Sequence, residues 1–166
     1  MSGITLRPPR IADAGALARI WVGICRYYAE MDPEAFQVPK EDGLVEWFVG
    51  FLGEPSLADE LSLVAEIDGE VVGSIEAKLI EPMEGAERQL LRELGDKRLS
   101  IETLTVERDH WRSGVGSALM EAAEAWAKER GATRSATYTY IDSPVSVPFY
   151  EKLGYKRRSI NFRKHL

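Results

Sequence analysis

The sequence predicts one α/β domain built on a mixed, mostly antiparallel sheet with helices on both of its faces. Two apolar runs, 61–67 and 71–77, flank Asp68-Gly69-Glu70, and this pattern is typical of an antiparallel hairpin. A strand, a long helix and a second strand follow one another between residues 99 and 141, and a right-handed crossover of this kind makes its two strands parallel. The chain has 166 residues, 45% hydrophobic and 29% charged, which is enough apolar material for one core.

The N-terminal part predicts a short strand and two helices. Residues 4–7 alternate apolar and polar side chains until Pro8-Pro9 ends the strand. Asp13 stands where it can cap a helix whose apolar positions recur every three or four residues. Residues 31–40 contain two prolines and indicate a loop, and 41–52 predict a second helix. The expected buried stripe of the first helix is Leu17, Ile20, Trp21, Ile24 and Tyr28.

The middle part predicts the hairpin, an insertion and the first crossover strand. Residues 82–94 are rich in Glu, Arg and Leu, so we expect a short amphipathic helix between two strands there. The strand at 99–106 follows. Its alternation places Leu99, Ile101, Thr103 and Thr105 on one face and Ser100, Glu102, Leu104 and Val106 on the other.

The C-terminal part predicts a long helix that Gly131 ends, then a strand at 133–141, a short helix at 144–153 and a last strand at 155–162. The chain contains no repeat or linker, so we expect residues 1–166 to form a single domain. The long helix should bury a stripe formed by Val115, Leu119, Ala122 and Trp126.

Composition argues against several classes of protein. A net charge of −6 and a pI near 5.1 disfavour unspecific nucleic-acid binding. Cys25 is the single cysteine, so no internal disulfide forms, and with His110 and His165 it is too little for a zinc site. The N-terminus lacks the apolar stretch of a signal peptide, and no run of about 18 apolar residues occurs. We therefore expect a cytoplasmic protein with no metal, membrane or nucleic-acid partner.

The segment 112–117 is the most informative one for function. It joins the end of the 99–106 strand to the long helix, and the first amide N–H groups of a helix suit a pyrophosphate. Gly114 and Gly116 would let phosphates approach the backbone; alternatively, they only form a tight turn. A dinucleotide fingerprint needs a third glycine where Leu119 stands, and a Walker-type loop needs Gly-Lys-Ser/Thr, which the chain lacks.

Two segments resemble the GNAT superfamily of acetyl-CoA-dependent N-acetyltransferases. One is Leu104-Thr-Val, four residues, then Trp111-Arg-Ser-Gly-Val-Gly-Ser-Ala-Leu; the other is Phe149-Tyr-Glu-Lys-Leu-Gly-Tyr155. The chain departs from the family pattern at three positions. Trp111 stands where the family has Gln or Arg, Ser143 where it often has Asn, and Pro148 should shorten or kink the last helix.

The resemblance implies a GNAT fold in which the central parallel strands, ending near Val106 and Ile141, splay apart around acetyl-CoA. The backbone of 104–106 would pair with the pantetheine arm, and the amides of 112–117 would hold the pyrophosphate. The cofactor-binding residues it implies are Leu104, Thr105, Val106, Arg112, Ser113, Gly114, Val115, Gly116, Ser117 and Ser143.

The resemblance also implies the catalytic residues of a direct attack by a primary amine. It assigns Glu102 as the base and Tyr150 as the acid that returns a proton to the CoA thiolate. A carboxyl pKa of about 4.3 is far below an ammonium pKa of about 10.4, so this glutamate should be desolvated or act through water. The alternatives are a structural ion-paired Glu102 and a core aromatic Tyr150, and Glu76 is a weaker base candidate.

The acetyl acceptor is the least determined part. In the family, the first two helices and the strand insertion shape the acceptor pocket, and here both regions carry Asp and Glu side chains. Such a pocket would fit a polyamine, an aminoglycoside-like compound, a lysine or a peptide N-terminus. Alternatively, these Asp and Glu side chains only form a solvated face. Other hypotheses are a non-catalytic acyl-CoA-binding module and a tRNA-modifying toxin, which the net charge disfavours. The family often dimerises, and residues 82–94 could form an interface or cover the pocket. The candidate acceptor residues are Tyr27, Tyr28, Glu30, Asp32, Glu81, Glu84 and Glu87.

Overall fold

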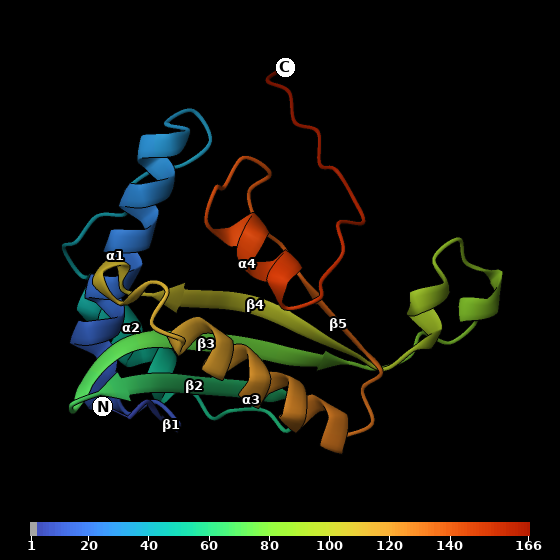
Figure 1. Cartoon of the computed structure of the whole chain (residues 1–166), viewed down its shortest axis with the longest axis horizontal. Helices are drawn as coiled ribbons and strands as arrows, with labels where there is room; N and C mark the ends of the chain where they lie inside the picture. The colour runs from blue at the N-terminus through green and yellow to red at the C-terminus, as the bar shows by residue number, and fades with distance from the viewer. Residues whose placement is uncertain (1–2) are drawn as a thin grey trace.

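A five-stranded sheet runs through the computed structural model, which describes residues 3–166 (Figure 1). Neighbouring strands are antiparallel from the first to the fourth, and the fourth and fifth are parallel. The mixed sheet predicted from the sequence is therefore confirmed. In spatial order the strands are β1 (Thr5–Arg7), β2 (Glu60–Ile67), β3 (Glu70–Ile80), β4 (Arg98–Val106) and β5 (Arg134–Thr137).

Helices cover both faces of the sheet. Side chains of Leu17 and Ile20 pack with Val64 on one face, whereas Leu119 belongs to the larger core cluster with Ile75 on the other. No helix in residues 3–166 is long and apolar enough to cross a membrane. The first face carries α1 (Ala14–Met31) and α2 (Leu44–Gly53), and the second carries α3 (Val115–Glu129) and α4 (Ser146–Lys152).

The hairpin between β2 and β3 turns at Asp68 and Gly69. Their φ angles are +52° and +84°, and two consecutive positive values are typical of the tight type I′ turn. Asp tolerates this backbone conformation better than most residues do. The turn predicted from the sequence is confirmed at the predicted residues.

The insertion at 82–94 contains no α-helix, so that prediction is wrong. It forms two short 3₁₀ turns, η2 (Ala86–Arg88) and η3 (Arg92–Gly95), and stands out from the end of the sheet as a separate lobe (Figure 1). Leu90 is 97% exposed there. An isolated amphipathic segment of this length has no surface on which to bury its apolar side, and a short helix is marginal without one.

The C-terminal part also differs from the prediction. β5 ends at Thr137 rather than at residue 141, and residues 155–162 pair with no strand in the described part of the chain. α4 has only seven residues. Pro148 lies in its first turn, where a missing N–H removes no intrahelical bond, so a short helix tolerates it.

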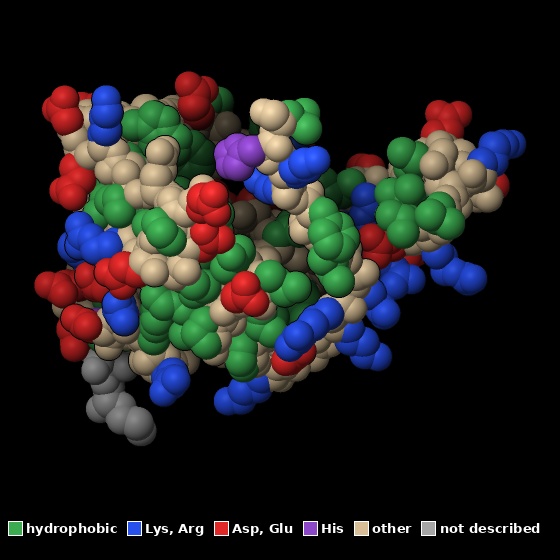
Figure 2. Space-filling view, turned by 90° about the horizontal axis from the view of Figure 1, so that it is seen from above, with side chains coloured by type: hydrophobic (Ala, Val, Ile, Leu, Met, Phe, Trp, Pro, Cys, Tyr) green, Lys and Arg blue, Asp and Glu red, His purple; other side chains and the backbone are tan. Residues whose placement is uncertain are grey.

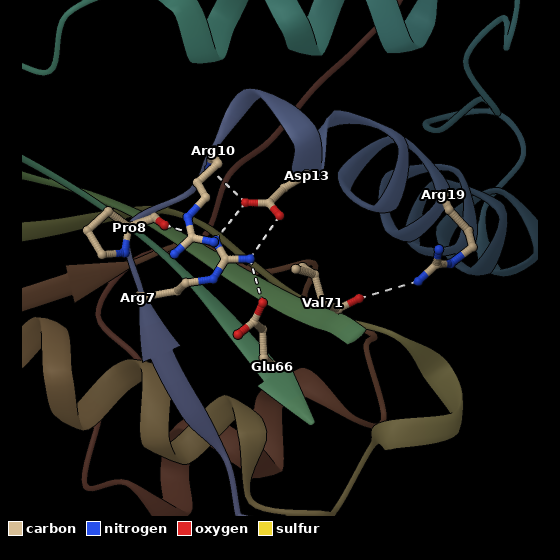
Figure 3. Close-up of polar contacts among 7 residues, drawn as sticks. All are labelled: Arg7, Pro8, Arg10, Asp13, Arg19, Glu66 and Val71. Atoms are coloured by element: carbon tan, nitrogen blue, oxygen red, sulfur yellow. Dashed lines mark hydrogen bonds and ion pairs between the residues drawn. The ribbon is translucent and has the colours of Figure 1, made fainter. Parts of the chain in front are cut away.

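A cluster of charged side chains joins β1, β2 and the start of α1 (Figure 3). Arg7 donates to both carboxylate oxygens of Asp13, at 2.8 and 2.9 Å, and to Glu66 at 2.5 Å. The Arg10 backbone N–H donates to Asp13 at 2.6 Å. The bond from Arg7 is the main cause that holds the pKa of Asp13 below its ordinary value. Asp13 occupies the cap position of α1, but its side chain makes no capping bond to that helix, contrary to the prediction.

We expect Asp13→Ala to lower the free energy of unfolding by about 2 kcal/mol at neutral pH, because a largely buried guanidinium loses its two bonds to Asp13 and keeps only Glu66 as a carboxylate partner. Urea denaturation measures this, with Asp42→Ala, which removes an exposed carboxylate, as the control. Since the pKa of Asp13 is lowered on folding, its stabilisation is present above the unfolded value of about 3.9 and is lost in stronger acid. A difference between wild type and variant that persists in strong acid would contradict this.

Candidate functional site

β4 and β5 form a fork. Their parallel ladder ends where Ile101 pairs with Thr137. β4 continues to Val106, so residues 102–106 have no strand partner on the β5 side among the described residues. The splayed parallel pair expected from the sequence is therefore present, and an extended chain in the fork could use these free backbone groups.

A β-bulge at Glu102 inverts the second half of β4. β3 pairs Ala77 with Ile101 and Glu76 with Thr103, which leaves Glu102 without a partner. Side chains directly opposite each other share a face of the sheet, and Leu104 lies opposite buried Ile75. The alternation predicted for this strand is wrong beyond the bulge. One face carries Leu99, Ile101, Leu104 and Val106, and the other carries Ser100, Thr103 and Thr105.

Two carboxylates lie beside this bulge, on the face that α1 and α2 cover. Burial raises the pKa of Glu76, and the Ser62 hydroxyl donates to its carboxylate. Glu102 is exposed and accepts a bond of 2.5 Å from Ser100. The desolvation that a direct base requires is thus found at Glu76, the weaker candidate of the sequence analysis, and not at Glu102.

The loop between β4 and α3 has the backbone that the glycines suggested. Gly114 precedes α3 with φ of +93°, a conformation that side chains with a Cβ rarely adopt. The first backbone bond of the helix runs from Ala118 N–H to Gly114 C=O, at 2.9 Å. The N–H groups of the three residues between them therefore have no intrahelical acceptor. These residues are Val115, Gly116 and Ser117.

Other groups of the loop are already engaged. The N–H and hydroxyl of Ser113 both donate to the carbonyl of His110. A Cβ on Gly116 would lie 3.2 Å from the Phe149 ring, so this glycine allows α4 to approach α3. Arg112 has a φ of +62°, which is unusual for a residue other than glycine. The tight-turn explanation and the anion-site explanation of the glycines are therefore compatible.

Trp111 has a definite role that the sequence did not indicate. Its indole N–H donates to the carbonyl of Val106 at 2.7 Å. The Glu107 N–H donates to the carbonyl of Val72 on β3 at 2.8 Å. Successive residues of a strand direct their N–H and C=O groups to opposite neighbours, so the backbone groups of Thr105 face β3 and those of Leu104 face the fork. Trp111 thus occupies one of the free carbonyls at the end of β4.

Tyr150 lies at the base of the fork. It comes from α4, packs its ring against Phe149 with centroids 5.1 Å apart, and is half-buried. Burial raises the pKa of Tyr150, and this outweighs the opposite effect of the neighbouring Thr137 hydroxyl. Thr137 is the last β5 residue that pairs with β4. The Tyr150 hydroxyl therefore stays protonated at neutral pH, close to the point where the two strands separate.

Ser143 is buried, with 2% of its surface exposed, and its hydroxyl accepts a bond of 3.1 Å from the Ser146 N–H. Its side chain thus stabilises the start of α4 and points into the protein. Contact between Ser143 and a cofactor stays a prediction that this geometry does not favour.

The end of α1 is joined to the connection between β5 and α4. The Tyr140 hydroxyl donates to Asp32 at 2.6 Å, which raises the pKa of Tyr140 to about 12 and lowers that of Asp32. Tyr28 and Ser146 share a bond of 3.1 Å. Phe36 packs edge-on against Tyr140, with centroids 5.1 Å apart. These contacts form an aromatic wall on one side of the fork.

The candidate acceptor residues do not form one group. Tyr27, Tyr28 and Asp32 lie at the end of α1, whereas Glu84 and Glu87 lie on the insertion, which stands apart from the body in both views (Figures 1 and 2). The exposed Glu81 side chain pairs with Lys97. The insertion therefore does not share a pocket with α1 within this chain.

A hollow of about 540 Å³ adjoins the end of β4. It lies between α1 and the residues after β4, and the ion pair of Arg19 with Glu107, at 3.0 Å, crosses its border. Neither Tyr150 nor Glu76 lines it. The hollow meets the fork at Val106, the last residue of β4.

Comparisons with known proteins agree with this architecture. Residues 21–155 match the sequence model of the Acetyltransferase (GNAT) family. Over 68 residues the chain is 32% identical to the aminoglycoside N(6')-acetyltransferase type 1 of Acinetobacter genomosp. 13, and this match covers 40% of the chain and 47% of the relative. The matched stretch is thus about half the length of that protein.

Solved structures of similar fold cover nearly the whole chain. A mutant Bacillus halodurans protein superposes with a TM-score of 0.80 at 16% identity, covering 98% of this chain and 99% of that one. An aminoglycoside N-acetyltransferase in complex with CoA has a TM-score of 0.64 at 17% identity, covering 100% and 97%. At such low identity, these likenesses show the fold.

Proposed function

We propose, since the chain belongs to the GNAT acetyltransferase family, that it transfers the acetyl group of acetyl-CoA to a primary amine of a small molecule or peptide. The observation that carries this proposal is the fork: residues 102–106 of β4 have no strand partner on the β5 side, and the protonated Tyr150 hydroxyl lies at its base. An acyl donor bound along β4 would then present its sulfur to this hydroxyl.

The residues of the fork fit the acyl donor that the family uses. The free N–H groups at the start of α3 suit a pyrophosphate, and the backbone of Leu104 suits an amide of the pantetheine arm. Of the ten residues expected to bind it, we retain Leu104 and Arg112 to Ser117 as proposals. Val106 and Ser143 are weaker candidates, because Trp111 and Ser146 already bond to them. Thr105 is weaker too, because its backbone groups face β3 and its buried hydroxyl bonds to Ser74.

The reaction needs two proton transfers that this chain can supply. The acceptor ammonium loses one proton, and its nitrogen forms a bond to the acyl carbon. The nitrogen then loses a second proton to solvent as the bond from that carbon to sulfur breaks, and solvent returns to Tyr150 the proton that the thiolate receives. We assign the first proton to Glu76, directly or through water, and retain Glu102 as a base that acts through water only. Tyr150 donates to the departing thiolate. Most of the remaining rate enhancement comes from holding the amine and the thioester next to each other.

The acceptor is a cationic amine. The similarity to an aminoglycoside acetyltransferase supports a small molecule with several amino groups. Glu76 and Glu102 lie on the sheet face toward α1, where they would attract such a cation.

Release of free thiol from acetyl-CoA in the presence of a panel of amines tests this function. Aminoglycosides, polyamines and lysine peptides form the panel, and we expect at least one to give catalytic turnover. A protein that binds CoA and releases no thiol with any amine would instead be a non-catalytic acyl-CoA-binding module.

We expect Gly114→Ala to weaken CoA binding at least about tenfold, because alanine is strained at a φ of +93° and would turn the amides of the loop. Gly131→Ala is the matched control. Gly131 has a φ of +86° beyond the other end of α3, so the backbone strain is similar but the loop is untouched. Calorimetric titration with CoA should separate the two variants, and equal affinities would argue against an anion site at this loop.

A further inference from the structure

Asp32 carries a negative charge that no cation of the described chain neutralises. One of its carboxylate oxygens accepts bonds of 3.2 Å from the N–H groups of Glu34 and Ala35, and the other accepts the 2.6 Å bond from the Tyr140 hydroxyl. The Tyr140 bond is the main cause that lowers the pKa of Asp32, so this carboxyl is ionised at neutral pH. No Lys or Arg within residues 3–166 forms an ion pair with it. A carboxylate held by neutral donors alone still attracts a cation strongly.

The place of Asp32 at the end of α1 adds to this negative potential. The backbone dipoles of a helix give its C-terminal end a partial negative charge. A Lys or Arg in the last turn would offset this charge, but the last turn of α1 contains neither, and it contains Glu30. A cation from outside the chain would therefore be stabilised both by the carboxylate and by the helix end.

Aromatic rings border the same carboxylate. The Phe36 ring contacts Tyr28 on one side and Tyr140 on the other, with centroids 5.1 Å apart in both pairs. The face of an aromatic ring attracts alkylammonium groups. Guanidinium groups of the chain lie over the rings of Tyr27 and Trp126, but none within residues 3–166 lies over the three rings beside the carboxylate. These rings are therefore available to a cation that does not belong to the chain.

The aromatic wall reaches the proposed catalytic hydroxyl. The Tyr28 hydroxyl shares its 3.1 Å bond with Ser146, which lies one helical turn before Tyr150 on α4. Residues four positions apart in a helix lie on the same side of it. Burial is the main cause that raises the pKa of Tyr150, and nearby Tyr28 adds to the rise. A molecule that extends along this wall could therefore reach from Tyr150 to the end of α1.

We propose that Asp32 binds a second ammonium group of the acceptor, and that the Tyr140 hydroxyl occupies this place until the acceptor displaces it. The bonds from Glu34 and Ala35 would keep the carboxylate in position during the exchange. A bond between two charged groups replaces one with a neutral hydroxyl, so the exchange is favourable for an ammonium. The chain would thus select acceptors with two or more amino groups over monoamines. This inference rests on the proposed function, whose acceptor site it extends.

Calorimetric titration of the CoA-bound protein tests the exchange, with spermidine and kanamycin as the acceptors with several amino groups and butylamine as the monoamine. We expect Asp32→Asn to weaken binding of at least one of the first two about tenfold or more, since it removes a charged bond, and to leave butylamine unchanged. We expect Tyr140→Phe to strengthen the same binding about threefold, because the acceptor no longer displaces a hydroxyl. Asparagine can still accept the bonds that Asp32 accepts, so the fold is retained.

The opposite signs distinguish exchange from a merely structural bond. Both substitutions weaken the same contact between α1 and the chain after β5, so a structural role predicts a loss of binding in both variants, and that result would overturn the proposal. Failure of spermidine and kanamycin to bind the wild type more tightly than butylamine would also overturn it. Asp42→Asn and Tyr138→Phe, which change exposed side chains outside the wall, are the matched controls and should bind as the wild type does.

Thiol release from acetyl-CoA, measured on the same variants, separates this inference from the proposed function. If spermidine or kanamycin is acetylated with equal KM by the wild type, Asp32→Asn and Tyr140→Phe, the exchange is wrong and the function stands. If the binding changes have the expected signs and no amine releases thiol, acetyl transfer is wrong and the ammonium site at Asp32 stands. We expect the KM for the polyamine to change in the same direction as its dissociation constant, with kcat within about twofold of the wild type.

Discussion

Replacing Tyr150 by phenylalanine should lower kcat at least about tenfold and change CoA affinity by less than about twofold. The variant keeps the ring that packs against Phe149 and removes only the hydroxyl beside Thr137. The thiolate would then leave without a proton donor. Because the lost interaction forms as the thiolate departs, it affects turnover rather than binding of the donor.

The pH dependence adds a second readout for Tyr150. Burial raises the pKa of this hydroxyl above its ordinary value of about 10, so it stays protonated while the acceptor amine loses its proton. We expect no descending limb of kcat below about pH 10 in the wild type. Tyr138→Phe, which changes an exposed tyrosine, is the control and should retain full activity. Equal turnover of Tyr150→Phe and the wild type would remove this residue from the mechanism.

Sequence patterns predicted the regions of the sheet whose pairing is regular. The hairpin turn at Asp68 and Gly69 is local chemistry, so it can be predicted from two residues. The bulge at Glu102 cannot, because it arises from pairing with β3 and leaves no local signal. A single extra residue exchanged the faces of everything after it in β4.

The predictions of a helix at 82–94 and of a strand at 155–162 were wrong for a related reason. Both have the periodicity of a regular element, but an element forms only where another surface buries its apolar side. Within one chain, Leu90 and Phe162 have no such surface.

The part of the candidate site that consists of backbone N–H groups, at the start of α3, could be predicted from the sequence. Glycines at 114 and 116 located the helix start correctly, since positive φ and close approach restrict residue type. Side-chain roles were less predictable. Trp111 bonds to the carbonyl of Val106, and Ser62 bonds to Glu76 on the next strand; both contacts depend on how strands and loops meet in space.

The Glu76→Gln variant should lower kcat/KM by about 100-fold, whereas Glu102→Gln should lower it by less than about tenfold. Glutamine keeps the size of the side chain and can still accept the bond from the Ser62 hydroxyl, so the fold is retained. It cannot accept a proton from the acceptor ammonium. Glu102 is exposed, and the substitution of a base that acts through exposed water lowers kcat/KM less.

The pH profile distinguishes a base from a merely structural carboxylate. Because burial raises the pKa of Glu76, the wild type should lose kcat/KM as the pH falls through this raised value, and Glu76→Gln should lack that loss. Unfolding temperature and CoA affinity, measured on the same preparations, should be those of the wild type. If Glu102→Gln causes the larger loss and flattens the profile instead, the base is Glu102, and burial of Glu76 then serves only the packing of β2 against β3.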